Sequence, residues 1–257
     1  MIKNAFGYSL KTLQKVCLAG MFISLTIILQ KVVAINYIPI MPFVRVSPGG
    51  PALIMFSSIF LGPIYGLVVG AGSDLLGYLI FDPKTYGLFP QITAIYAVLG
   101  FSTYYIFWLL KKFRNEKLSF FILLGVLLSL GIGTSLFFIL NDQVTLYSST
   151  YIFELWQKIL LPISIFLLIG ILFLVLVLMK KTNKGNNDLM NIWQIGLASY
   201  VLEIVVMVLF GSLMKAWAFN FNFFVIAICQ IVVLFINVPL NTFLIGTFMR
   251  LTKRFKK

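Results

Sequence analysis

The sequence predicts an all-α integral membrane protein, a bundle of about eight transmembrane helices in a single transmembrane domain over residues 1–257. Two features of the composition indicate this class. Of the 257 residues, 61% are hydrophobic and 11% are charged, whereas soluble domains contain about half apolar and about a quarter charged residues. The expected surroundings are a lipid bilayer, and a water-soluble enzyme or a nucleic-acid-binding domain is excluded. No nucleic-acid partner is expected in spite of the net charge of +13.

The absence of histidine excludes most catalytic and metal sites. The chain alone cannot form a Ser-His or Cys-His nucleophile pair, an HExxH zinc site or a two-histidine iron site. Its acidic residues are not clustered in the way that a magnesium and pyrophosphate site requires. Cys17 and Cys229 lie in separate apolar runs and are interpreted as small core hydrophobes. We therefore expect no metal, no cofactor and no enzymatic activity.

Apolar runs mark the expected helices. A hydrocarbon core about 30 Å thick is crossed by about 20 apolar residues in a helix. Runs of about this length or longer occur at residues 16–35, 51–81, 91–110, 119–140, 152–179, 192–213 and 222–249. These seven runs give eight helices only if the longest of them, 51–81, contains two.

The basic residues predict the orientation and bear on this question. Most of the 20 Lys and Arg residues lie in four stretches, at the amino end and at 111–117, 180–184 and 250–257. Loops rich in Lys and Arg stay on the cytoplasmic side. We therefore expect a multi-pass protein of the cell (cytoplasmic) membrane with both termini in the cytoplasm. All four stretches share that side only if the run 51–81 crosses the membrane an even number of times.

The run 51–81 is accordingly interpreted as a short helical hairpin. One helix over this run would rise about 46 Å, which is too long for one comfortable span and too short for two full ones. Gly62-Pro63 offers a break, because proline has no N–H for a continuing helix and suits the first turn of a new one. We expect helices at 51–61 and 63–81. The alternative is one long tilted helix, in which case the charge rule fails here.

Glycines and a carboxylate recur along one side of the helix 63–81. Gly62, Gly66, Gly70 and Asp74 are spaced four residues apart, and small residues at this spacing let another backbone approach closely within lipid. The glycines therefore predict helix packing. A carboxylate within a span costs about 2.5–3.5 kcal/mol on insertion scales, so Asp74 is expected to face protein or water. It suits the floor of an outward-facing pocket; the alternative is a structural bond to nearby backbone amides.

Two outer connections flank this hairpin and complete a candidate small-molecule site. The first, residues 36–51, carries Arg45, which suits a ligand carboxylate or phosphate. The second, residues 82–93, carries Tyr86 and Phe89, which can stack on a flat ring. The alternative for each aromatic residue is anchoring at the membrane interface. The further candidate contacts in the second connection are Gln91 and Thr93.

Glu203 is a second carboxylate within an apolar run. The sequence leaves three environments open for it. It can line a cavity, pair with a Lys or Arg, or stay protonated against a polar neighbour such as Gln230 or Asn237.

Several segments resemble one transporter family. They are Arg45-Val46-Ser47, GPIYGLVVGAGSDLLGYLIF at 62–81, YGLFPQITAIYAVLGF at 86–101 and the closing helix NVPLNTFLIGTFMRL. In this order they resemble the substrate-binding S component of energy-coupling factor (ECF) transporters, the vitamin-uptake systems of prokaryotes, and most closely its folate-type subfamily. The resemblance implies a six-helix S-component-like core, to which this chain adds a helical pair at about 119–180.

The resemblance also implies partners and a mode of action. An S component binds a vitamin from outside, and a membrane scaffold subunit and ATPase subunits drive its uptake. The chain contains no Gly-Lys dipeptide and hence no Walker A loop, in agreement with a subunit that has no motor. The family docks on its scaffold through small residues of the first helix. Here these are Ala19, Gly20 and Ser24, with Ile23 at a position where the family has a small residue.

Three other functions compete with this hypothesis. The first is a self-sufficient secondary transporter that uses Asp74 or Glu203 as a proton site. An intramembrane enzyme is disfavoured by the missing histidine and the unclustered carboxylates. A membrane assembly factor without a ligand is the third alternative.

Overall fold

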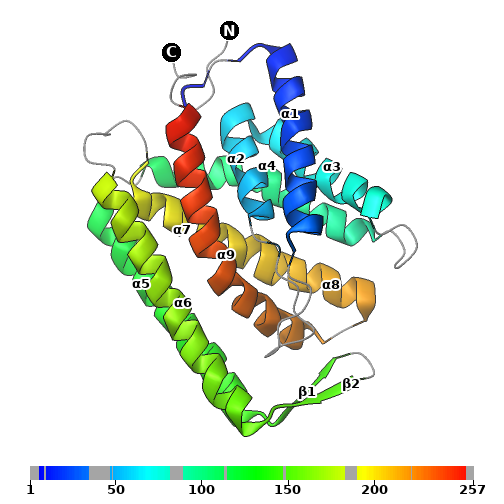
Figure 1. The fold of residues 1–257 in the computed structure, drawn as a ribbon, viewed down its shortest axis with the longest axis vertical. Coiled ribbons are helices and arrows are strands. Elements are labelled where there is room, and N and C mark those ends of the chain that lie inside the picture. Colours follow the sequence, from blue (N-terminus) through cyan, green and yellow to red (C-terminus); the bar gives the residue numbers. More distant parts are fainter. Residues whose placement is uncertain are drawn as a thin grey trace.

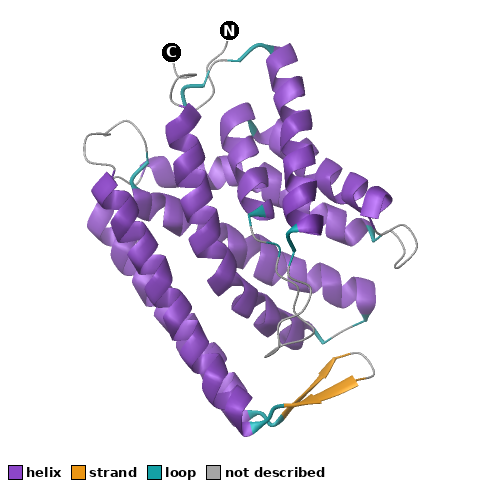
Figure 2. Ribbon diagram, viewed as in Figure 1, coloured by secondary structure: helices purple, strands orange, loops and turns teal. Residues whose placement is uncertain are grey.

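The computed structural model describes residues 6–8, 10–34, 47, 49–81, 89–112, 115–146, 149–182, 190–220 and 222–252. In this part of the chain, seven helices are long and apolar enough to cross a membrane, and a shorter apolar helix, Gly50–Leu61, accompanies them. The prediction of an α-helical membrane bundle is confirmed (Figures 1 and 2). The α-helices are α1 (Thr12–Ile27), α2 (Gly50–Leu61), α3 (Pro63–Phe81), α4 (Pro90–Lys112), α5 (Glu116–Leu140), α6 (Leu155–Thr182), α7 (Ile192–Leu202), α8 (Gly211–Phe219) and α9 (Phe223–Leu251).

Two π-helical segments interrupt the regular helices. The first, η1 (Ile28–Val32), continues α1, and the second, η2 (Glu203–Phe210), joins α7 to α8. Helices α7, η2 and α8 therefore form one continuous span, Ile192–Phe219. A π-helix is rare and is frequently found at functional sites. Both segments are therefore candidate positions for functional residues.

A two-stranded sheet joins α5 to α6 and departs from the predicted run of 152–179. Strand β1 (Gln143–Leu146) pairs antiparallel with β2 (Ser149–Ile152), with Gln143 opposite Ile152, and α6 begins only at Leu155. The strands QVTL and STYI are rich in β-branched and aromatic residues, which favour strands over helices. The helical pair itself agrees with the expected pair at 119–180, and α5 and α6 lie side by side along one flank of the bundle (Figure 1).

The run 51–81 is divided at the expected glycine. Gly62 has a φ of 110°, which side-chain-bearing residues rarely adopt, and Pro63 starts α3. A Cβ on Gly66 would lie 2.5 Å from Cβ of Ser58. Since these two residues are equally far from Gly62 along the chain, α3 folds back onto α2. All residues of α2 are buried, so this short helix is sheltered by protein, as membrane interiors require.

Glycines bring the backbones of α3 and α4 into contact. A Cβ on Gly66 would lie 2.6 Å from the carbonyl oxygen of Gly100, and a Cβ on Gly100 would in turn overlap the carbonyl of Gly66. A Cβ on Gly70 would overlap the carbonyl of Tyr96. Gly62 does not share this contact: no atom lies within 4 Å of the Cβ position there, and its role is in the break.

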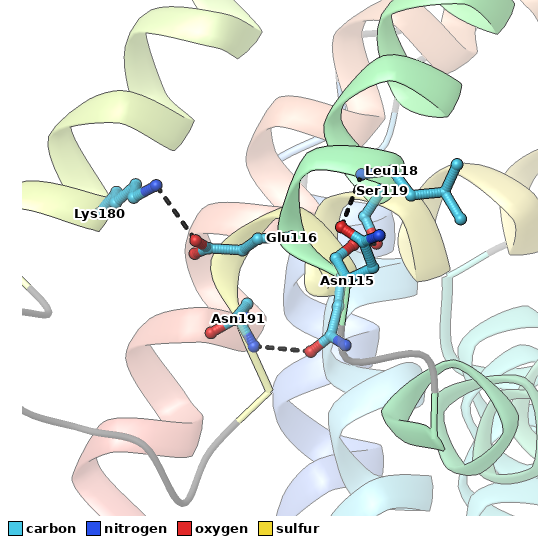
Figure 3. A network of polar contacts seen from close by, with 7 residues as sticks. Asn115, Glu116, Leu118, Ser119, Lys180 and Asn191 are labelled. Atoms are coloured by element: carbon cyan, nitrogen blue, oxygen red, sulfur yellow. Dashed lines mark hydrogen bonds and ion pairs between the residues drawn. The ribbon is translucent and has the colours of Figure 1, made fainter.

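The described parts of all four basic stretches lie at one end of the bundle, called here the basic end. Lys111 of α4 lies over the ring of Phe6, 5.4 Å from its centroid. Arg250 of α9 donates to the carbonyl of Met179 of α6 at 2.9 Å. The Lys180 ammonium and the Glu116 carboxylate are 3.4 Å apart, which joins α6 to α5 (Figure 3).

Helix starts at the basic end are satisfied by side chains. Asn115 precedes α5 and accepts from the backbone N–H of Leu118 at 3.3 Å. Asn191 caps α7, and its own N–H donates to the side chain of Gln194 at 2.8 Å. The Gln194 amide also donates to the carbonyl of Leu110 in α4 at 3.3 Å. The first two bonds satisfy N–H groups, and the third satisfies a carbonyl group, that helix termini leave without an internal partner.

Tyr8 links the two ends of the described chain. Its hydroxyl lies 3.2 Å from that of Thr252. The Thr252 hydroxyl donates to the carbonyl of Phe248 at 2.7 Å, so Tyr8 is the donor of the bond between them. Burial raises the pKa of Tyr8 above its ordinary value of 10.0, and the bond to Thr252 partly offsets this effect. The phenol therefore remains a neutral donor at physiological pH.

The glycine contact predicts a strong effect of one added methyl group. Gly70→Ala places a Cβ against the Tyr96 backbone, which has no rotamer to change. We expect a loss of roughly 1–3 kcal/mol of stability, typical of overpacking, measured as a lower melting temperature in detergent. The matched control is Gly125→Ala in α5, where nothing lies within 4 Å of the Cβ position. Equal melting temperatures for both variants would contradict the packing described.

Candidate functional site

Asp74 and Thr93 meet at the end of α3 and α4 that lies away from the basic end. The Thr93 hydroxyl donates to the Asp74 carboxylate at 2.6 Å. Asp74 lies within α3, seven residues before its last residue, Phe81, and Thr93 lies in the first turn of α4. Seven residues of helix span about 10 Å. The structure thus brings together two of the residues that the sequence proposed for a ligand site, and both are half-buried.

Lys31 packs against α3 one turn beyond Asp74, although the sequence analysis did not select it. A Cβ on Gly77 would lie 3.2 Å from Cε of Lys31, so the Lys31 side chain runs along α3. Gly77 follows Asp74 by three residues, which places the two on neighbouring parts of one helix side. Lys31 belongs to the π-helical segment η1. In the sequence, Lys31 could have been recognised as a basic residue at the outer end of an apolar run, away from the four basic stretches.

The second outer connection packs partly on its own chain. The ring of Phe89 lies against Phe219 of α8, with centroids 4.6 Å apart, so at least one side of Phe89 is occupied by protein. Gln91 is two residues from Thr93 and therefore points to a different side of α4. Its side-chain oxygen is buried and has no hydrogen-bond partner among the described residues. Arg45 and Tyr86 lie outside the described residues.

The proposed docking residues on α1 do not share one surface. Gly20 and Ser24 are exposed, and the Ser24 hydroxyl donates to the carbonyl of Gly20 at 3.1 Å. Ala19 is only 5% exposed and belongs to the hydrophobic core of this chain. A partner on this face of α1 can therefore reach Gly20 and Ser24, whereas Ala19 faces inward.

Glu203 forms a second buried polar centre. Its carboxylate is 1% exposed and accepts from the Asn241 amide of α9 at 2.7 Å. The sequence offered Gln230 or Asn237 as polar neighbours, and the structure gives Asn241 as the hydrogen-bond partner. Lys215 of α8 also acts electrostatically on Glu203. None of the ion pairs in the described part of the chain includes Glu203.

Comparisons with known proteins do not identify a relative of this chain. No family model, no curated protein and no solved structure matches the chain. Within the described residues, no three His, Cys, Asp or Glu side chains gather in a way that could hold a metal ion. Asp74, Thr93 and Lys31 offer a carboxylate, a hydroxyl and an ammonium, so the chemistry available there is hydrogen bonding and charge.

The Asp74–Thr93 bond predicts a difference between two substitutions. Thr93→Val removes the donor and leaves a carboxylate within a span with one hydrogen bond fewer. Hydrogen bonds to charged groups contribute about 1.5–3 kcal/mol, so we expect a clear fall in melting temperature. Thr93→Ser keeps the hydroxyl and is expected to restore most of the stability. If Thr93→Val and Thr93→Ser melt alike, the bond does not hold α3 to α4.

Proposed function

We propose that this chain is the substrate-binding subunit of a membrane transporter for a vitamin or related small molecule, of the ECF S-component type. The observation that carries the proposal is the Asp74–Thr93 pair with Lys31 beside it. A carboxylate held by a hydroxyl near an ammonium, at one end of an otherwise apolar bundle, suits a polar ligand better than lipid.

The chemistry of the pair constrains the ligand. Asp74 accepts hydrogen bonds from N–H or O–H groups of a ligand, and Lys31 attracts an anionic group such as a carboxylate or phosphate. A small molecule with a donor edge and an anionic tail fits both, and a folate-like compound is one example. The ligand would enter at the end opposite the basic end, which the positive-inside rule assigns to the outside.

The proposal also includes partners that supply energy. The chain has no Gly-Lys dipeptide and therefore no Walker A loop to bind ATP phosphates. We propose that a membrane scaffold subunit docks on the exposed face of α1 at Gly20 and Ser24, and that ATPase subunits act through that scaffold.

Ligand binding is tested by analysing the small molecules that copurify with the chain. We expect mass spectrometry to find one vitamin-class compound with the wild type. Asp74→Asn should reduce its occupancy at least about tenfold, because it removes a charged hydrogen-bond acceptor. Asp142→Asn is the matched control, since Asp142 is exposed next to β1. A vitamin panel that shows no binding to the wild type would overturn the proposal.

Docking is tested by substitution on the exposed face of α1. Gly20→Leu adds a side chain where no atom lies within 4 Å, so the chain should fold as before. We expect it to lose copurification with the scaffold and ATPase subunits. Gly125→Leu, at an equally open position on α5, should retain both. Retention by both variants would show that the partner binds elsewhere.

A self-sufficient secondary transporter is the second candidate, and the buried Glu203 favours it. In vesicles that contain only this chain, such a transporter would take up its ligand without ATP and would stop when an uncoupler is added. An S component would bind the ligand in the same vesicles without accumulating it.

A further inference from the structure

A polar cluster crosses the contact between the α7–η2–α8 span and α9. Ser199 and Glu203 are four residues apart on one span, and Asn237 and Asn241 are four residues apart on the other, so each pair shares a helix side. All four are at most 5% exposed. The chain turns back between α8 and α9, which makes the two spans antiparallel. Asn237 and Ser199 therefore flank the Glu203–Asn241 bond on opposite sides.

Three side-chain oxygen atoms of this cluster have no hydrogen-bond partner among the described residues. Asn241 donates its amide to Glu203 at 2.7 Å, but its own side-chain oxygen is buried without a hydrogen-bond partner. That oxygen belongs to the same planar amide, so it lies beside the carboxylate. The side-chain oxygens of Asn237 and Ser199 are also buried without a partner. A buried polar group that is left without a partner is unfavourable.

Glu203 begins the π-helical segment η2. A π-helix interrupts the regular backbone bonding of its span and is frequently found at functional sites. Here it coincides with the one carboxylate of the cluster.

We propose that Glu203 and Asn241, flanked by Asn237 and Ser199, form a buried site for a sodium ion. Sodium is a hard cation and binds oxygen ligands, which the Glu203 carboxylate and the Asn241 amide supply. Ser199 and Asn237 lie about one turn away on opposite sides, so at most one of them would add a further oxygen directly. A single carboxylate matches a single positive charge, whereas divalent ions in proteins usually draw on more carboxylates. The bound ion would neutralise Glu203 and hold η2 against α9. This site is separate from the Asp74–Thr93 pair and does not depend on the proposed function.

Lys215 is the group that competes with the ion. It lies on α8, is half-buried, and its charge acts on both Glu203 and Cys229. It is not within ion-pair distance of Glu203 among the described contacts. If the site binds sodium, removal of this positive charge strengthens binding; if Lys215 is instead the internal counter-ion, its removal destabilises the chain without any gain in sodium affinity.

The experiment measures ²²Na⁺ binding to the purified full-length chain, and its melting temperature in sodium chloride against choline chloride at equal ionic strength. We expect saturable binding and a higher melting temperature in sodium for the wild type. Glu203→Gln should abolish both, Asn241→Ala should weaken binding at least about tenfold, and Lys215→Met should tighten it. Glu154→Gln, at an exposed position, should behave as the wild type.

Several outcomes would overturn the sodium site. One is no sodium binding by the wild type, which would leave water as the occupant of the cluster. Another is a melting temperature that responds to pH and not to sodium, which would make Glu203 a proton site. A third is a Lys215→Met variant that binds sodium no more tightly than the wild type does. The sodium site shares no residue with the Asp74–Thr93 pair, so its failure would not decide the proposed ligand site.

Discussion

The backbone contact of α3 with α4 is the constraint on which the candidate site depends. Gly66 and Gly100 leave no room for side chains between the two helices, and the helices can therefore approach closely in lipid, where packing replaces the hydrophobic effect. This approach brings Thr93 within 2.6 Å of Asp74. The same glycine, Gly66, also receives Ser58 of the buried helix α2. One small residue thus positions the hairpin, the helix pair and the carboxylate.

Two charged residues of the candidate sites lie where regular helix geometry is interrupted. Lys31 belongs to η1 and Glu203 begins η2, while Gly62 provides the break that starts α3. A span of regular helix has all its backbone groups satisfied internally and needs no polar side chains. Irregular turns present both backbone and side chains to a neighbour, and Lys31 and Glu203 lie at such turns. Their neighbours in the two candidate sites, Asp74 and Asn241, lie in regular helices and are brought there by helix packing.

Sequence alone predicts the parts of this structure that depend on local chemistry or on charge. The break at Gly62-Pro63 follows from proline geometry together with the siding of the basic residues, and the described residues of the four basic stretches do gather at one end. The strands β1 and β2 escape prediction because four-residue strands next to long apolar helices leave a weak signal. The partner of Glu203 also escapes it, because Asn241 lies 38 residues away and only the packing of α7 and η2 on α9 selects it over Asn237. The inward orientation of Ala19 also escapes prediction, because it depends on how α1 packs in the bundle.

We propose above all that a small polar molecule binds at Asp74 and Thr93. The most direct measurement is an experimental structure of the chain in a lipid nanodisc, purified with the small molecules that it retains. We expect density for a non-lipid molecule within hydrogen-bond distance of the Asp74 carboxylate and the Lys31 ammonium. Density for lipid acyl chains at that position, or direct closure of the site by the chain itself, would contradict it.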